Sequence, residues 1–146
     1  MTVIRFPRAS VMISKSLNGE CQCGQVQYSI LRDASRLHIC HCLDCQKQSG
    51  SAFGMSLIIQ PETFQLNSGE LSTFLTSTAS GHKKTCAFCP NCGVRIYNKT
   101  HALMAIKAGT LDDTSQLSPD AHYWTKRKQP WVVLPDDIQC FEEVLQ

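Results

Sequence analysis

Nine cysteines stand in this chain of 146 residues, and most of them fall into three short groups. The groups read "GECQCGQV", "CHCLDC" and "CAFCPNCG", and they hold Cys21 and Cys23, then Cys40, Cys42 and Cys45, then Cys86, Cys89 and Cys92. Cys140 stands apart from all three. Zinc takes four soft ligands at tetrahedral corners, with Zn–S distances near ~2.3 Å. A Cys-x-x-Cys turn places two sulfur atoms on one side of such an ion. We therefore expect metal binding, with zinc favoured over an iron–sulfur cluster.

The cysteine pattern argues against a framework of disulfides. An odd number of cysteines would leave one unpaired. The N-terminal segment "MTVIRFPRASVMISKS" has no sustained apolar run, so no secretory signal is expected and we place the chain in the reducing cytoplasm. Two arrangements stay open on spacing alone: two closed structural sites of four cysteines, or a site of three protein ligands with a position left for chemistry. Spacing does not say which group partners which.

Composition removes two classes of partner. The formal net charge is +2, and the one tight basic run is Lys126-Arg127-Lys128, which is too little for a protein that binds nucleic acid by charge. No apolar stretch approaches the ~18 residues that a membrane-spanning helix needs. Neither nucleic acid nor a membrane is therefore expected as a partner, and the sequence gives no oligomeric state.

Alternating apolar residues predict the elements that must position the cysteines. This period-2 pattern recurs over residues 26–30, 53–59, 94–96 and 104–108, which indicates short, half-buried strands. Residues 64–66 and 71–74 flank the turn signal "NSGE" and predict a hairpin. One short helix is expected near Cys45 to Gln48. The prediction is a mainly β protein, with residues 1–18 as a leader of unknown role and 19–146 as a single domain.

Five motifs carry a resemblance to a known family. They are "GECQCGQVQY", "CHCLDCQKQSGSAFG", "FCPNCGVRIY", "AGTLDD" and "AHYWTKRKQPW", in this order from about Gly19 to Trp131. In these the chain resembles the glutathione-dependent formaldehyde-activating (GFA) family. The resemblance implies a β-tent of antiparallel sheets pinned by zinc, with at most short helices. It also implies two zinc ions per chain. The structural ion would be held by Cys21, Cys23, Cys89 and Cys92, and the catalytic ion by the three thiolates of Cys40, Cys42 and Cys45.

Charge then suggests the chemistry of the second ion. Zn²⁺ with three thiolates carries about −1 overall, which makes it a mediocre Lewis acid but a good partner for a fourth thiol, because a coordinated thiol loses its proton. The resemblance implies a carbon–sulfur lyase with glutathione as co-substrate, in which the glutathione thiolate attacks formaldehyde to give S-hydroxymethylglutathione, or the reverse. Two alternatives are a non-catalytic module that carries glutathione or another thiol, and a zinc-stabilised interaction module.

Several further residues receive candidate roles. Lys47, with the basic run at 126–128, is expected to complement the carboxylates of glutathione. Ser49, Gly50 and Ser51 are candidates for substrate contacts, or equally for a plain turn from loop to strand. His41 is expected to point away from the metal, and His122 to be a packing residue. Cys86 either closes the second zinc site as a fourth ligand or, as we expect, is a small buried hydrophobic residue.

Overall fold

The computed structural model describes residues 16–31, 35–78 and 81–144, so most of the expected leader lies outside the described residues. The described part contains eleven strands, one α-helix and three short 3₁₀-helices. The prediction of a mainly β protein with at most short helices is therefore confirmed. The first strand begins at Leu17, so the last two residues of the expected leader are part of a sheet. Within the described ranges, no helix is long and apolar enough to span a membrane.

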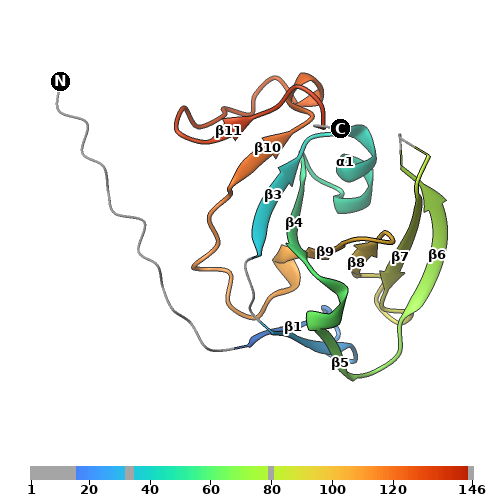
Figure 1. Cartoon of the computed structure of the whole chain (residues 1–146). Coiled ribbons are helices and arrows are strands. Elements are labelled where there is room, and N and C mark those ends of the chain that lie inside the picture. Colours follow the sequence, from blue (N-terminus) through green and yellow to red (C-terminus); the bar gives the residue numbers. More distant parts are fainter. Residues whose placement is uncertain (1–15, 32–34, 79–80, 145–146) are drawn as a thin grey trace.

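The strands form two sheets, which Figure 1 shows one below the other. The small sheet has the order β1-β2-β5 and is antiparallel; it consists of β1 (Leu17–Glu20), β2 (Gln27–Ile30) and β5 (Phe64–Ser68). The large sheet has the order β11-β10-β3-β4-β9-β8-β7-β6. Its strands are β3 (Arg36–Cys40), β4 (Gly54–Ile59), β6 (Ser72–Ser77), β7 (Lys83–Phe88), β8 (Arg95–Lys99), β9 (Met104–Lys107), β10 (Ala121–Tyr123) and β11 (Gln139–Cys140).

Most pairs in the large sheet are antiparallel, whereas β10 runs parallel to both β3 and β11. The helix α1 (Leu43–Ser49) follows β3 and lies in the curve of this sheet, between β4 and the strands β7 and β8 (Figure 1). It contains the helix expected near Cys45 to Gln48. The 3₁₀-helices are η1 (Pro61–Thr63), η2 (Ala108–Thr110) and η3 (Thr125–Arg127).

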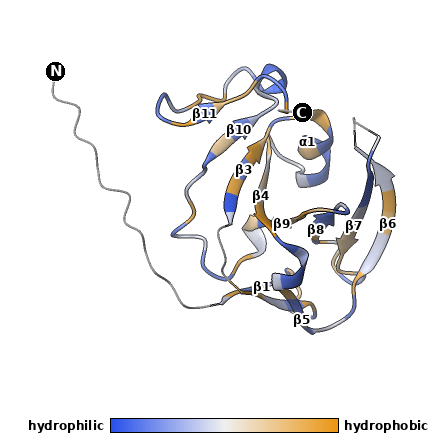
Figure 2. Ribbon diagram, viewed as in Figure 1, coloured by the Kyte–Doolittle hydropathy of each residue, from blue (hydrophilic) through white to orange (hydrophobic). Residues whose placement is uncertain are grey.

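The core joins the two sheets through the alternating residues. Tyr28 and Ile30 of the small sheet belong to the same buried cluster as Leu57, Ile96 and Ile106 of the large sheet. Figure 2 shows hydrophobic segments along β3 and β4. Burying a side chain of this size contributes roughly 1.5–3 kcal/mol relative to leaving it in water. The sheets are thus held together by apolar packing from strands that are distant in sequence.

The predicted hairpin at residues 64–74 is wrong. Both strands and the turn between them exist, with Gly69 at φ +81°, but β5 pairs with β2 and β6 pairs with β7. The aromatic ring of Phe64 stacks on Tyr28 at a centroid distance of 5.4 Å, which attaches β5 to the small sheet. A Cβ at Gly69 would lie 2.3 Å from the carbonyl oxygen of Gln25, so the turn packs closely on this sheet too. The chain therefore crosses between the sheets here.

Candidate functional site

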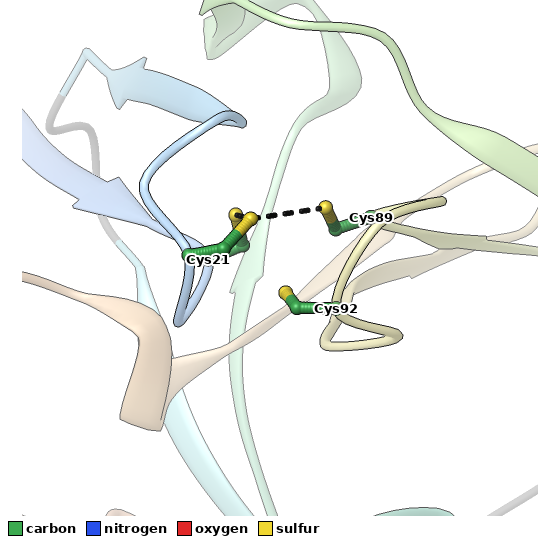
Figure 3. Close-up of side chains that lie close together, drawn as sticks. Cys21, Cys89 and Cys92 are labelled. Atoms are coloured by element: carbon green, nitrogen blue, oxygen red, sulfur yellow. Dashed lines mark hydrogen bonds between the residues drawn. The ribbon is translucent and has the colours of Figure 1, made fainter.

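Four cysteines from two distant segments of the chain meet where a strand of the small sheet and a strand of the large sheet end. Cys21 and Cys23 follow β1, and Cys89 and Cys92 follow β7; we call them the four-cysteine cluster. Their sulfur atoms all lie within 4.8 Å of one another. Figure 3 shows Cys21 on one turn facing Cys89 and Cys92 on the other. The grouping that the family resemblance implied for a structural site is thus brought together in space.

The two turns of this cluster are built alike. The amide of Cys21 donates to the carbonyl of Val26, and the amide of Cys89 donates to the carbonyl of Val94, both at 3.0 Å. Gly24 and Gly93 hold φ angles of +78° and +77°, which residues with a Cβ adopt only with strain. The amide of Val26 also donates to Sγ of Cys21 at 3.3 Å. Each turn therefore presents its two sulfurs to the same point.

The sulfur spacing in the four-cysteine cluster suits an ion with tetrahedral coordination. Four sulfurs at ~2.3 Å from zinc would be separated by about 3.8 Å. Sγ of Cys23 lies 3.5 Å from that of Cys21 and 3.7 Å from that of Cys89. Cys21 and Cys89 are buried in the core, so their thiolates would need a cation for balance. The donor set and its spacing fit zinc.

A second group, the three-cysteine cluster, comes from one continuous segment. Cys40 ends β3, Cys42 is the N-cap of α1, and Cys45 lies in its first turn, with the three sulfurs within 4.8 Å of one another. Sγ of Cys42 accepts a hydrogen bond from the amide of Cys45 at 3.3 Å. Gly50 ends the helix in the left-handed conformation, with φ +62°. The short helix thus fixes two of the three sulfurs.

The three-cysteine cluster concentrates negative charge. Hydrogen bonds from the thiols of Cys40 and Cys45 lower the pKa of Cys42 to about 2. The same sharing, together with burial, raises the pKa of Cys40 well above its usual range. Without a cation, one thiolate therefore forms at the expense of its neighbours. A dication removes this conflict, so this donor set also fits zinc, with three protein ligands.

Cys86 and Cys140 lie apart from both clusters. Cys86 is buried in β7, opposite Phe74 and Asn98 in the register, and in the described part of the chain its sulfur joins neither group. Cys140 is exposed in β11, and its thiol donates to the carbonyl of Ile138 at 3.5 Å. Among the residues that the structure describes, the three-cysteine cluster therefore has no fourth sulfur.

The structure separates the residues predicted for substrate contacts. Ser49 and Ser51 line a hollow of about 410 Å³ that runs along α1 and the start of β4. Their hydroxyls also donate to the carbonyl of Phe53, at 3.0 and 2.9 Å, as expected of a turn. Lys47 and Gly50 line a second surface depression beside Trp131, and Ser51 borders both spaces. These four residues therefore do not face one common space.

The basic run at 126–128 lies beside α1. Lys126 forms an ion pair with Glu143 and lies over the ring of Trp124, at 5.1 Å from the ring centroid. The side-chain amide of Gln46 in α1 donates to the carbonyl of Arg127 at 3.0 Å. The charge of Lys126 is thus already paired with a carboxylate of the protein.

His41 and His122 form a buried pair. Nε2 of His41 lies 2.9 Å from Nδ1 of His122, and the rings stack. Burial lowers the pKa of both imidazoles, so the pair is neutral near pH 7. His41 also packs edge-on against Phe53. The pair joins the parallel strands β3 and β10 next to the three-cysteine cluster.

Two cations that the sequence prediction missed line the hollow that Ser49 and Ser51 border, which we call the basic hollow. Lys107 is buried at the end of β9, and Arg95 is half-buried at the start of β8. Gly54, which also lines the hollow, lies beside Cys45: a Cβ added there would be 3.6 Å from Sγ of Cys45. The basic hollow is thus next to the three-cysteine cluster. The sequence did offer one signal for Lys107, because a lysine within the apolar segment "MAIKAG" indicates a buried charge.

Burial and the cysteines act on Lys107 in opposite directions. Loss of solvent lowers the pKa of its amine, and the negative charge of the nearby Cys45 and Cys40 thiolates counteracts part of that effect. Arg95 and Lys84 lower it further, because they are like charges. The three-cysteine cluster therefore has negative charge at its sulfurs and positive charge beside them, at Lys107 and Arg95.

The chain is a mainly β protein of antiparallel sheets with two cysteine clusters, one of four thiols and one of three, each of which could hold a metal ion such as zinc. The sequence profile described as "Glutathione-dependent formaldehyde-activating enzyme" matches residues 16–127, well over half of the chain. The chain therefore belongs to the GFA family. No curated protein matches the sequence.

A solved structure agrees with the fold. A crystal structure of a Rhodobacter sphaeroides protein matches with a TM-score of 0.52 at 16% sequence identity. The match covers 70% of this chain and 91% of the other. At this identity the similarity concerns the fold alone.

Proposed function

We propose that this chain is a zinc-dependent carbon–sulfur lyase that forms or cleaves the adduct of a thiol and an aldehyde. Glutathione and formaldehyde are the proposed co-substrates, and S-hydroxymethylglutathione is the proposed adduct. The observation that carries the proposal is the three-cysteine cluster, which has no fourth sulfur among the described residues and lies next to a hollow. Nine free thiols also suit a reducing compartment such as the cytoplasm.

The two clusters receive different roles in this proposal. Cys21, Cys23, Cys89 and Cys92 hold a structural zinc that ties the small sheet to the large one. Cys40, Cys42 and Cys45 hold the catalytic zinc. Bound there, zinc would supply a position for the substrate thiol and favour its deprotonated form, which is the nucleophile.

In the addition, the thiolate sulfur forms a bond to the aldehyde carbon, and the carbonyl electron pair moves to oxygen. The oxygen then takes up a proton, which balances the one that the thiol released on becoming a thiolate, and becomes the hydroxyl of the adduct; cleavage reverses these steps. The contribution of the chain is to hold the two partners together and in line. The three cysteines fix the sulfur position, and Lys107 and Arg95 place positive charge beside it, which favours an anionic nucleophile.

The test compares zinc content and catalysis in matched variants. We expect the wild-type chain to hold two zinc ions and to accelerate exchange between glutathione, formaldehyde and the adduct beyond the spontaneous rate, measured by NMR. Cys42→Ser should hold one zinc and fall to the spontaneous rate. Cys140→Ser, an exposed cysteine outside both clusters, is the control and should match the wild type.

Three results would contradict the proposal. Retention of both zinc ions by Cys42→Ser would remove the three-cysteine cluster from the mechanism. Glutathione binding to the wild type without any acceleration would make the chain a thiol carrier. If the chain neither binds glutathione nor accelerates the exchange, the remaining role for it is that of a zinc-stabilised interaction module.

A further inference from the structure

Lys107 is a buried cation, and the proposed zinc chemistry assigns it no contact with a particular group of the substrate. Its side chain is 8% exposed, and Nζ donates to the hydroxyl of Ser56 at 3.2 Å. Among the described residues, no carboxylate lies within ion-pair distance of it. A buried ammonium without a carboxylate is costly, because a neutral hydroxyl replaces only part of the lost hydration. The sulfurs of Cys45 and Cys40 are the negative groups that act on Lys107, so its ammonium places positive charge between the three-cysteine cluster and the basic hollow.

Arg95 lines the same hollow and is also without a carboxylate in the described part of the chain. Its guanidinium is held in place by neutral groups. It donates to Oδ1 of Asn98 at 2.7 Å and to Oε1 of Gln48 at 3.3 Å, and it lies over the ring of Phe74 at 4.9 Å from the centroid. Asn98 in turn donates to Gln48 at 3.0 Å. Arg95 is thus oriented without being neutralised.

No acidic residue lines the basic hollow. Asp44, at the start of α1, is in an ion pair with Lys84 at 2.9 Å. The remaining polar lining consists of hydroxyls and amides, including Ser49, Ser51 and Thr110. A space lined by two cations and neutral hydrogen-bonding groups favours an anion, and a guanidinium suits the two oxygens of a carboxylate.

We propose that the basic hollow is a carboxylate subsite, with Arg95 as its anchor and Lys107 on the side of the three-cysteine cluster, and that it selects thiols that carry a carboxylate. The inference rests on the proposed function, since it assumes that the thiol sulfur lies at the three-cysteine cluster. It also moves the recognition of glutathione from Lys47, which lines another depression, to residues that sequence reasoning did not single out.

The experiment measures carboxylate preference rather than activity. The zinc-loaded full chain is titrated calorimetrically with glutathione and with glutathione diethyl ester, at one pH and ionic strength. The ester keeps the thiol and removes both carboxylates. We expect glutathione to bind the wild type about tenfold more tightly than the ester, the scale of a charge-assisted hydrogen-bonded contact.

Variants then locate the preference. Arg95→Gln should bind the ester like the wild type and bind glutathione no better than the ester. Arg95→Lys, which retains the charge and loses the planar fork, should keep part of the preference. Lys47→Gln and Lys99→Gln, which change exposed lysines outside the hollow, should keep all of it. Zinc content and thermal unfolding confirm that each variant is folded and loaded.

The outcomes separate this inference from the function on which it rests. Equal affinities for glutathione and its ester in the wild type would overturn the subsite while leaving thiol binding intact. A full preference retained by Arg95→Gln, or lost by Lys47→Gln, would overturn the assignment of residues. A wild type that binds neither thiol would overturn the proposed function itself.

Discussion

The two cysteine clusters differ in how the chain builds them. The four-cysteine cluster joins residues more than sixty positions apart, through two turns of the same design, and half of its sulfurs belong to the core. The three-cysteine cluster comes from six consecutive residues and is arranged by one short helix. A closed set of thiols that links distant strands suits a structural ion, whereas an open set beside a hollow suits chemistry. The same residue type thus gives two kinds of site.

The largest expected effect comes from opening the four-cysteine cluster. We expect Cys89→Ser to lose the zinc that links the sheets and to lower the melting temperature by more than about 10 °C, or to abolish cooperative unfolding, because metal binding of this kind is coupled to folding. Thermal unfolding followed by circular dichroism, with zinc content per chain, measures this. A variant that unfolds like the wild type would show that this cluster is not structural.

Opening the three-cysteine cluster should have a different consequence. Cys45→Ser should release one zinc and lose glutathione binding, while the melting temperature changes by less than about 5 °C, because the core between the sheets is untouched. Unfolding of this variant to the same extent as Cys89→Ser would remove the distinction between the clusters.

Acid should separate the clusters without any mutation. Protons compete with zinc for thiolates, so both ions are held at neutral pH and released as the pH falls. The three-cysteine cluster has fewer protein ligands and an adjacent hollow, and we expect it to release zinc about one pH unit above the four-cysteine cluster. A zinc-sensitive dye should report two release steps, and Cys42→Ser should keep only the more acidic step. A single step that releases both ions would contradict this.

The smallest effect is expected at Cys86. It is buried in β7 outside both clusters, so Cys86→Ala should cost about 1 kcal/mol in unfolding free energy through lost packing and should leave two zinc ions in place. Denaturant unfolding and zinc analysis check both parts. Loss of one ion would show that this sulfur closes the three-cysteine cluster.

Local sequence patterns did not predict β1, β3, β7, β10 or β11. They were enough to predict β2, β4, β5, β6, β8 and β9, the helix near Cys45 and, with the family motifs, the grouping of the seven clustered sulfurs. These features depend on residues close in sequence or on recurring motifs. Sheet partners were not predictable in the same way. Alternation shows that β5 is a strand, but its pairing with β2 depends on packing between Phe64 and Tyr28, which are far apart in the chain.

The candidate site shows the same limit. Lys47 was predicted to complement the carboxylates of glutathione, and it lines a different depression from Ser49. Arg95 and Lys107 are about fifty positions or more away from the three-cysteine cluster in sequence, and they reach its neighbourhood only because β8 and β9 curve around α1 (Figure 1). A buried charge in a strand is recognisable in sequence, but the space it faces is not.

X-ray absorption at the zinc edge, before and after addition of glutathione, tests the central claim most directly. The account predicts two ions per chain with an average of about 3.5 sulfur ligands, rising to about 4 with glutathione and unchanged with S-methylglutathione, whose sulfur carries no ionisable proton. An average of four sulfurs before any thiol is added would mean that the protein alone completes both sites, and it would contradict the proposed chemistry.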